Sequence, residues 1–233
     1  MQNLKNLQKK GERMDYERPS NCWYKSVCQT DVCDHCIRYM EMSHLLENSG
    51  IPKVRQRPTT LVPDDADYNS FVMLSDIKDN ILQRVEDGFN LYIGSRNTGN
   101  GKTSWAIKIM LKYFDSIWAG NGFNVRGLFV HVPTLLSRLK DFDNPLSFEY
   151  RNNLLKADLI IWDDIAVSGI SQYDYNNLLM YIDNRILNEK SNIFTSNKTS
   201  KYDLEEVIGN RLASRIWETS TKITLVGKDR RNG

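Results

Sequence analysis

An apolar segment that runs directly into a glycine-rich loop constrains the fold of this chain more than any other feature. Residues 91–103 read LYIGSRNTGNGKT, and residues 104–114 carry apolar side chains at helical spacing. Gly99 and Gly101 allow the backbone to curl so that successive N–H groups point at one phosphate group. The segment therefore predicts a strand, a phosphate-binding loop and a helix whose N-terminus faces the phosphates.

The end of this loop carries side chains suited to a nucleoside triphosphate. Lys102 can reach the β and γ phosphate oxygens, and Thr103 can offer its hydroxyl to Mg²⁺. The usual pattern, G-x-x-x-x-G-K-[ST], has glycine where this chain has Arg96, although Gly94 lies two residues earlier. The later glycines, which shape the loop, are present. The expected ATP-binding residues of the loop are Asn97, Thr98, Gly99, Asn100, Gly101, Lys102, Thr103 and Ser104.

A second apolar segment, residues 159–162 (LIIW), ends in two carboxylates, Asp163 and Asp164. Such a run is typical of a central parallel strand that is buried on both faces. We expect Asp163 to hold the Mg²⁺ shell and Asp164 to polarise an attacking water, because phosphoryl transfer depends mainly on positioning and charge stabilisation. The alternative is a solvated turn. Together with the loop, the pair predicts a site for a nucleoside triphosphate and its magnesium ion.

The composition is that of an ordinary globular protein. Of the 233 residues, 40% are hydrophobic and 26% are charged, and the net charge is +2. The length suits one domain of about 170–180 residues with a small appendage. The charge excludes a global basic excess for nucleic acid but leaves room for a local basic patch. No apolar run approaches 18 residues and the N-terminus lacks an apolar signal core, so we expect a cytoplasmic protein.

The cysteines are confined to a short N-terminal stretch with the spacing C-x5-C-x4-C-x2-C. They are Cys22, Cys28, Cys33 and Cys36. In a reducing compartment, clustered thiols predict a metal site before they predict disulfides, and four thiolates satisfy tetrahedral Zn²⁺. His35 and His44 are alternative ligands. A redox C-x-x-C pair and inert thiols are the alternatives to zinc. A module this small needs such a site, because hydrophobic burial alone would not fold it.

Three regions follow from the distribution of prolines and apolar residues. They are a zinc module at 1–48, a linker or extended strap over the next domain at 49–70, and the main domain at 71–233. The main domain alternates strand and helix patterns, which favours an open parallel α/β sheet with ligands at the carboxyl ends of its strands. The expected strands are 91–94, 127–131, 159–162, 192–196 and 222–226. The expected helices are 75–88, 103–118, 134–141, 147–156, 172–189 and 203–217.

This topology suggests roles for two later segments of the chain. Asn197 follows the strand 192–196, and we expect it to hydrogen-bond the γ-phosphate or the attacking water. The alternative is a helix cap or an Asx turn. Arg211 and Arg215 lie four residues apart on one predicted helix face. They are either solvated surface charges or, in an oligomer, the source of an arginine finger that reaches a neighbour's γ-phosphate.

The order of these motifs resembles the AAA+ ATPases, and among them the replicative helicase loaders of the DnaC/DnaI type and their phage relatives. The Walker B strand ends in Asp-Asp, and the segment 195–197 (TSN) matches the sensor 1 segment of that group. The N-terminal cysteines followed by 49–52 (SGIP) resemble the zinc-bearing N-domain and strap of the DnaI branch. The resemblance covers 71–233 well and the first 50 residues loosely. Arg96 is its main departure.

The resemblance implies an AAA+ P-loop ATPase domain without a C-terminal helical lid, preceded by a small zinc-binding, helicase-interacting module. It assigns Walker A to Lys102 and Thr103, Walker B to Asp163 and Asp164, and sensor 1 to Asn197. It assigns the finger to Arg215, with Arg211 one turn earlier. It also makes the C-terminal arginines Arg230 and Arg231 candidate nucleotide contacts.

It further implies a homo-oligomeric spiral ordered by ATP, in which the N-terminal module holds a hexameric DnaB-type replicative helicase. Single-stranded DNA would pass over basic and aromatic side chains inside the spiral. The candidates for this contact are Arg138, Lys140 and Phe142, with a solvated helix face as the alternative. The rival interpretations are a transposition helper of the IstB type, a helicase-binding modulator that does not load, and a small-molecule P-loop kinase.

Overall fold

The computed structural model describes residues 22, 28, 36–56, 60–119, 124–140 and 147–229. The chain divides into two compact units, Met1–Met40 and Glu41–Gly233. Helix α1, Ile37–Asn48, begins in the first unit. Cys33 and His35 lie outside the described residues, so the four-cysteine zinc site stays a prediction. Within the described part of the chain, no helix is both long and apolar enough to cross a membrane.

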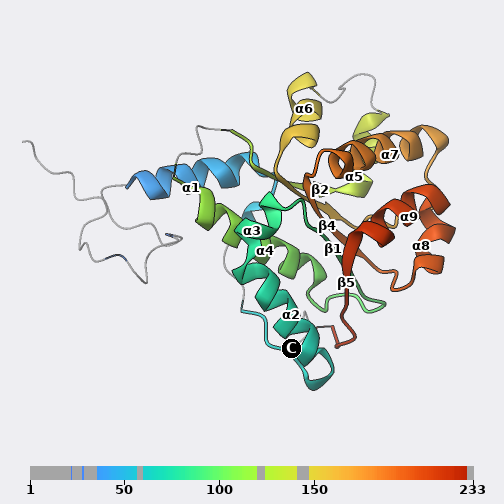
Figure 1. Ribbon diagram of the computed structural model, residues 1–233, viewed down its shortest axis with the longest axis horizontal. Helices are drawn as coiled ribbons and strands as arrows, with labels where there is room; N and C mark the ends of the chain where they lie inside the picture. Colours follow the sequence, from blue (N-terminus) through green and yellow to red (C-terminus); the bar gives the residue numbers. More distant parts are fainter. Residues whose placement is uncertain are drawn as a thin grey trace, which may run out of the picture. The chain divides into compact units, whose positions relative to one another are not determined.

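The second unit is built on a five-stranded parallel sheet with the strand order β2-β3-β4-β1-β5 (Figure 1). The strands are β1 Asn90–Gly94, β2 Gly127–His131, β3 Leu159–Asp163, β4 Ser191–Ser196 and β5 Ser220–Thr224. All five residues of β3 are buried, as the apolar run predicts. The predicted parallel α/β sheet is confirmed. The last strand begins two residues before the predicted 222, because Ser220 pairs with Asn90 at the start of β1.

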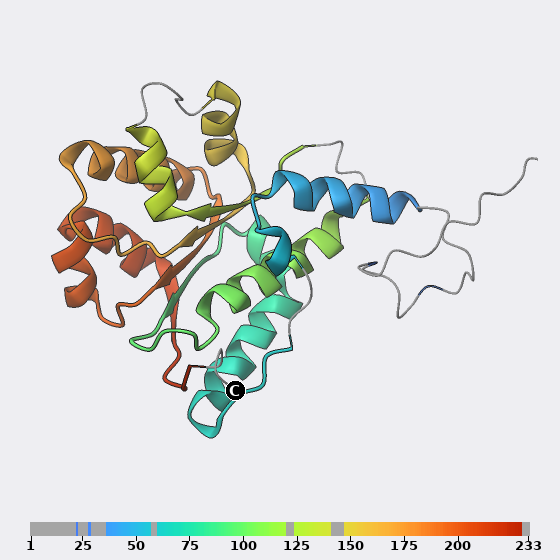
Figure 2. The same cartoon turned by 180° about the vertical axis from the view of Figure 1, so that it is seen from behind.

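Helices cover both faces of the sheet (Figures 1 and 2). On one face lie α2 Tyr68–Asp79, α3 Ile81–Glu86 and α4 Lys102–Ile117. On the other lie α5 Val132–Leu139, α6 Phe148–Lys156, α7 Gln172–Leu187, α8 Lys201–Ile208 and α9 Asn210–Thr219. Side chains that alternate along the strands, including Tyr92, Trp162 and Phe194, form one buried cluster with α5 to α9.

Two helices predicted as continuous are each broken in two. The predicted helix 75–88 is α2 and α3, which are separated at Asn80. The predicted helix 203–217 is α8 and α9, which are separated at Gly209. Gly209 has a φ angle of +79°, and a Cβ there would lie 3.1 Å from the Tyr175 ring. Glycine therefore permits a sharp turn that helical periodicity alone does not reveal.

The segment between α1 and α2 lies against the sheet as a strap in its described parts. The Phe129 amide of β2 donates to the Ser49 carbonyl (2.6 Å), which anchors the start of the strap. Its other end is held by Asp67, a fully buried carboxylate that accepts from the amides of Val226 (2.7 Å) and Gly227 (3.0 Å). The short 3₁₀ helices η1 Lys53–Arg55 and η2 Asp65–Asp67 lie within the strap.

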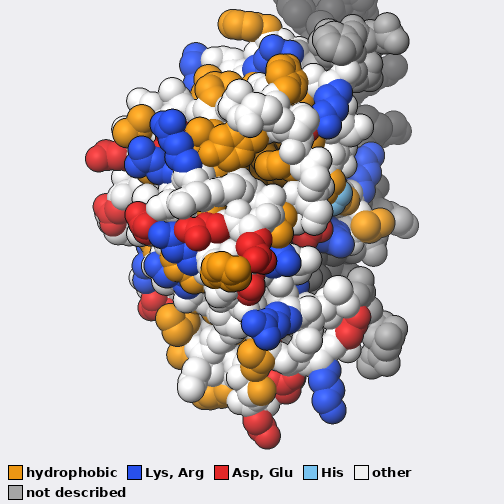
Figure 3. All heavy atoms as spheres, turned by 90° about the vertical axis from the view of Figure 1, so that its right-hand side faces the viewer, with side chains coloured by type: hydrophobic (Ala, Val, Ile, Leu, Met, Phe, Trp, Pro, Cys, Tyr) orange, Lys and Arg blue, Asp and Glu red, His pale blue; other side chains and the backbone are white. Residues whose placement is uncertain are grey.

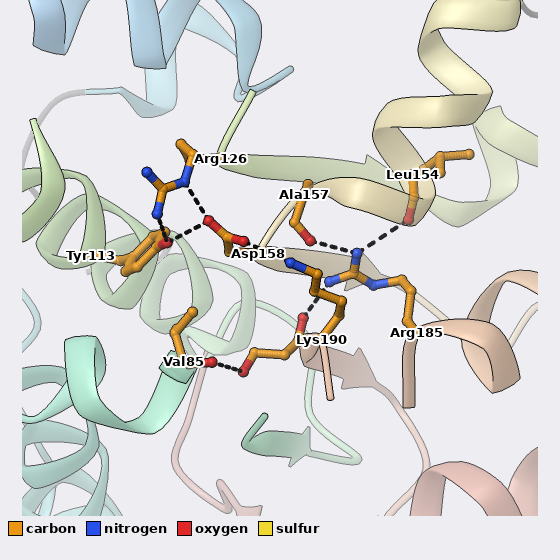
Figure 4. A network of polar contacts seen from close by, with 9 residues as sticks. Val85, Tyr113, Arg126, Leu154, Ala157, Asp158, Arg185 and Lys190 are labelled. Atoms are coloured by element: carbon orange, nitrogen blue, oxygen red, sulfur yellow. Dashed lines mark hydrogen bonds and ion pairs between the residues drawn. The ribbon is translucent and has the colours of Figure 1, made fainter. Parts of the chain in front are cut away.

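A polar network ties together the amino ends of β2, β3 and β4 (Figure 4). Asp158, just before β3, accepts from Arg126, from Lys190 Nζ (2.9 Å) and from the Tyr113 hydroxyl (3.0 Å). The fully buried Arg185 donates to the carbonyls of Leu154 (3.2 Å), Ala157 (2.7 Å) and Ser191 (2.7 Å) and to Asn192 Oδ1 (2.8 Å). This end of the sheet is therefore fixed by hydrogen bonds among the chain's own residues.

Candidate nucleotide-binding site

The glycine-rich loop leaves the carboxyl end of β1 and enters the N-terminus of α4. Its first amide is held by β4, because Ser95 N donates to the Ser196 carbonyl (3.0 Å). Gly99 and Gly101 have φ angles of +67° and +104°, which residues with L side chains rarely adopt. Helix α4 begins at Lys102. The backbone thus turns the start of a helix toward the position where a phosphate would bind.

Two asparagines brace the loop against the segment that follows β5. Asn100 is buried, and its side-chain amide donates to the Ser95 hydroxyl and to the Leu225 carbonyl (3.2 Å). The Asn97 amide donates to the carbonyls of residues 226 and 227 (2.8 and 3.0 Å). Side chains predicted as nucleotide contacts therefore also hold the shape of the loop.

Arg96, which stands where the usual loop pattern has glycine, lies at the surface. The Arg96 side chain is 80% exposed, and its guanidinium lies 4.0 Å from the Asp203 carboxylate. Gly94 belongs to β1, and a Cβ there would come within 2.7 Å of the Lys198 carbonyl oxygen. Gly94 therefore permits the close approach of the segment after β4 and does not replace the missing loop glycine.

The two side chains predicted to hold Mg²⁺ meet at the end of β3. Thr103 Oγ1 and Thr195 Oγ1 each donate to Asp163 Oδ1 at 2.8 Å. Burial raises the pKa of Asp163 and the charge of Asp164 raises it further, although the threonine hydrogen bonds and the charge of Arg55 lower it. Hydroxyl and carboxylate oxygens are the ligands that Mg²⁺ prefers. The residues present therefore fit the ion that the sequence predicts.

Asp164 has a backbone conformation that residues other than glycine seldom adopt. Its φ angle is +55°, and its amide donates to Thr195 Oγ1 (3.0 Å). Its carboxylate lies 3.8 Å from His131 Nε2 at the end of β2. Within the described residues, His131, Asp163 and Asp164 are the group whose potential metal-ligand atoms all lie within 4.8 Å of one another. Backbone strain of this kind concentrates at functional sites.

These elements line one cleft of about 870 Å³. Residues 98–104, Asp163, Asp164 and Asn197 all contribute to its walls. The helix-cap alternative for Asn197 is wrong, because the cap of α8 is Ser200, whose hydroxyl accepts from the amide three residues later. The cleft therefore contains the predicted loop, both predicted carboxylates and the predicted polar residue after β4.

No protein-family model matches the chain, and no curated protein matches its sequence. Solved structures do match it. The DnaC helicase loader superposes with a TM-score of 0.59 and 22% identity over 70% of this chain and 92% of that one. DnaI superposes with a TM-score of 0.61 and 18% identity over 76% and 95%. The fold is that of the DnaC/DnaI-type AAA+ helicase loaders.

A more distant AAA+ structure also matches. It is the replication initiator DnaA bound to AMPPCP and single-stranded DNA, with a TM-score of 0.52 and 18% identity over 71% of this chain and 48% of that one. The AAA+ fold expected from the order of the motifs is thus confirmed, including its five-stranded parallel sheet.

Within this AAA+ fold, the two arginines predicted as fingers do not line the cleft. Arg215 Nε lies 2.8 Å from Asp183 Oδ1, and Arg211 Nη2 lies 3.6 Å from Asp183 Oδ2. Asp183 belongs to α7, which packs against α9. Figure 3 shows this side of the molecule, where acidic and basic side chains lie next to one another. The arginines are therefore paired within their own chain.

The structure describes two of the three residues predicted to contact DNA, Arg138 and Lys140. Lys140 Nζ lies 2.7 Å from Oδ2 of Asp174, a buried residue in the capping box of α7, so Lys140 has a structural partner. Arg138 lines an adjoining groove of about 530 Å³ beside α5 and α6 and does not line the nucleotide cleft. Phe142 lies outside the described residues, as do Arg230 and Arg231, which were predicted as nucleotide contacts. All of these contacts remain predictions.

Two residues that line the cleft were missed by sequence reasoning. His131 follows an apolar strand just as Asp163 does, and the register of β2 and β3 pairs the two residues. That signal was available in the sequence. Arg55 comes from the strap, and its place in the cleft depends on how the strap folds, so no local pattern identifies it.

Proposed function

We propose that this chain is an ATPase that loads a hexameric DnaB-type replicative helicase onto single-stranded DNA. The main support for ATPase activity is the hydrogen bond from the Thr103 hydroxyl to the Asp163 carboxylate. Both residues line the same cleft as Lys102. The similarity of the fold to DnaC and DnaI supports the loading function.

ATP binding would use the loop and the start of α4. The loop amides and the helix N-terminus provide N–H groups for the phosphates. Lys102 Nζ donates to the Asn97 carbonyl (2.9 Å), and we expect it to exchange that carbonyl for the β and γ phosphate oxygens. Thr103 and Asp163 would hold Mg²⁺, which neutralises charge on the phosphates when it is bound.

Hydrolysis would use the two polar groups that face the far end of the phosphates. Asp164 would accept a proton from the attacking water and Asn197 would orient that water, since both residues line the cleft. The water oxygen forms a bond to the γ-phosphorus as the bond from that phosphorus to the β–γ bridging oxygen breaks. The products are ADP and inorganic phosphate. The unusual backbone conformation of Asp164 supports this assignment, because such conformations concentrate at functional sites.

A neighbouring subunit of a homo-oligomer would help to stabilise the negative charge of the transition state. Arg215, or Arg211 one turn earlier, would supply a guanidinium to the γ-phosphate of that neighbour. Both arginines face Asp183 in their own chain, so the arginine that acts as the finger would have to leave Asp183. Loss of Arg215 should therefore reduce hydrolysis only under conditions in which subunits assemble.

The helicase would be held by residues 1–48, with zinc bound by Cys22, Cys28, Cys33 and Cys36. Single-stranded DNA would follow a path that includes Arg138, and hydrolysis would release the loader. Elemental analysis of the full chain should find one zinc per molecule. A metal-free chain that still binds the helicase would contradict the zinc assignment.

Recovery of partners from an extract of the source organism tests the loading function. The full-length chain, carrying an affinity tag, is incubated with the extract and ATP, and bound proteins are identified by mass spectrometry. A hexameric replicative helicase should be recovered with the wild type, and single-stranded DNA should stimulate ATP hydrolysis of the purified pair. Recovery of a transposase in its place, or no enrichment of the helicase, would contradict the proposal.

A further inference from the structure

The first turn of the strap is held in a defined position beside the nucleotide cleft. Ser49 is fully buried, and its carbonyl accepts from the Phe129 amide (2.6 Å) of β2. Ile51, the second residue after it, is 3% exposed. The Gln56 side-chain amide donates to the Ile51 carbonyl (2.9 Å) and so links the two ends of η1. These bonds on both sides of η1 hold its backbone beside the cleft.

Arg55 is the last residue of η1 and lines the same cleft as the phosphate loop and the acidic pair. Among the described residues that line this cleft, Arg55 and Lys102 are the ones with a permanent positive charge. Lys102 sits at the start of α4, whereas Arg55 comes from a part of the chain about 50 residues earlier. Asp163 lines the same cleft as Arg55.

The place of Arg55 relative to Asp163 indicates which phosphate it faces. A nucleotide bound to this loop would place its β and γ phosphates near the end of β3, because Thr103 and Asp163 would hold the magnesium ion there. A guanidinium is a planar fork of donors that matches two phosphate oxygens at once. Within the described part of the chain, the Arg55 guanidinium forms no hydrogen bond or ion pair that would compete for it.

We propose that Arg55 binds the terminal phosphate of ATP held by its own chain, so that the strap distinguishes ATP from ADP. This inference rests on the proposed nucleotide site and adds to it a positioning residue from outside the sheet. It differs from the role proposed for Arg215, which would act on a neighbour's nucleotide.

The test compares ATP and ADP affinity, with magnesium, in three full-length variants by titration calorimetry. Arg55→Gln should weaken ATP binding by about 10- to 100-fold and change ADP binding by less than about 2-fold. Lys53→Gln is the matched control, because it lies in the same 3₁₀ helix but does not line the cleft, and it should change neither affinity. Arg55→Lys keeps the charge and should restore part of the ATP affinity.

Two outcomes would overturn the proposal separately from the nucleotide site. An unchanged ratio of ATP to ADP affinity in Arg55→Gln would show that Arg55 does not bind the terminal phosphate, even if both affinities fell together. ATP binding by Lys53→Gln that fell as far as that of Arg55→Gln would show that the strap acts through its fold alone. A wild-type chain that bound neither nucleotide would overturn the proposed nucleotide site, and the role of Arg55 with it.

Discussion

Two aspartates lie at opposite ends of β3, and they differ in the side chains that contact them. Asp158, at the amino end, is paired with Arg126 and Lys190. Asp163, at the carboxyl end, accepts hydrogen bonds from the hydroxyls of Thr103 and Thr195. Burial raises the pKa of both carboxyls, but the bonds from Lys190 and Arg126 outweigh it at Asp158 and lower that pKa.

The amino end of β3 contributes to stability, whereas its carboxyl end contributes to the proposed nucleotide site. At the amino end, the chain satisfies its own charges and thereby holds the strands in register. At the carboxyl end, it leaves a buried carboxylate with a raised pKa and a second carboxylate on a strained backbone. Such a costly arrangement is expected where an external cation and phosphate complete the site.

The largest predicted effect is at the amino end of the sheet, on replacing Arg185 with methionine. Burial lowers the pKa of Arg185 to about 9, so it stays charged at neutral pH while it donates to four acceptors. Arg185→Met leaves those buried acceptors without donors and should cost about 3–5 kcal/mol of unfolding free energy. Chemical denaturation measures this. The exposed Arg151→Met on α6 is the control, and an equal effect of the two would contradict the comparison.

A smaller loss is expected for Asp158→Asn, about 1–2 kcal/mol at pH 7, because the ion pairs are only partly buried. The folded-state pKa of Asp158 lies below its unfolded value. Its stabilisation is therefore complete above the unfolded pKa of about 4 and disappears as the pH falls through the folded pKa. The difference from wild type should shrink accordingly in acid denaturation series. The exposed Asp79→Asn should show almost no loss at any pH.

The smallest predicted effect has the opposite sign. Asp163→Asn should stabilise the chain at pH 7 by up to about 1 kcal/mol, because it removes a buried charge while its amide oxygen can still accept from Thr103 and Thr195. The folded-state pKa of Asp163 is raised, so the penalty is present above that pKa and is relieved as the pH falls through it. Denaturation of both variants across pH measures this. Destabilisation as large as that of Asp158→Asn would refute the distinction between the two ends.

The sheet and the core of the site could be predicted from sequence because their signals are local. The apolar run before Asp163 and the glycines before Lys102 each define a strand end or a loop without reference to distant residues. Parallel strands then bring their carboxyl ends to one edge. For the same reason His131 could have been found, since it also follows an apolar strand.

The remaining features depend on contacts between distant segments. The pairing of Arg215 with Asp183 follows from the packing of α9 on α7, which no spacing within either helix specifies. The break at Gly209 was missed because apolar periodicity continues across it, whereas the turn depends on a positive φ angle. The place of Arg55 in the cleft follows from a backbone bond between the strap and β2.

Binding of magnesium-ATP to the full-length chain, measured by titration calorimetry, tests the central claim most directly. Wild type should bind, and Lys102→Ala should weaken the affinity by at least about 100-fold, because it removes a charge-assisted contact with the phosphates. Lys112→Ala is the matched control on the same helix and should bind as wild type does. A Lys102→Ala variant that remains folded and binds ATP as tightly as wild type would contradict the assignment of this cleft as the nucleotide site.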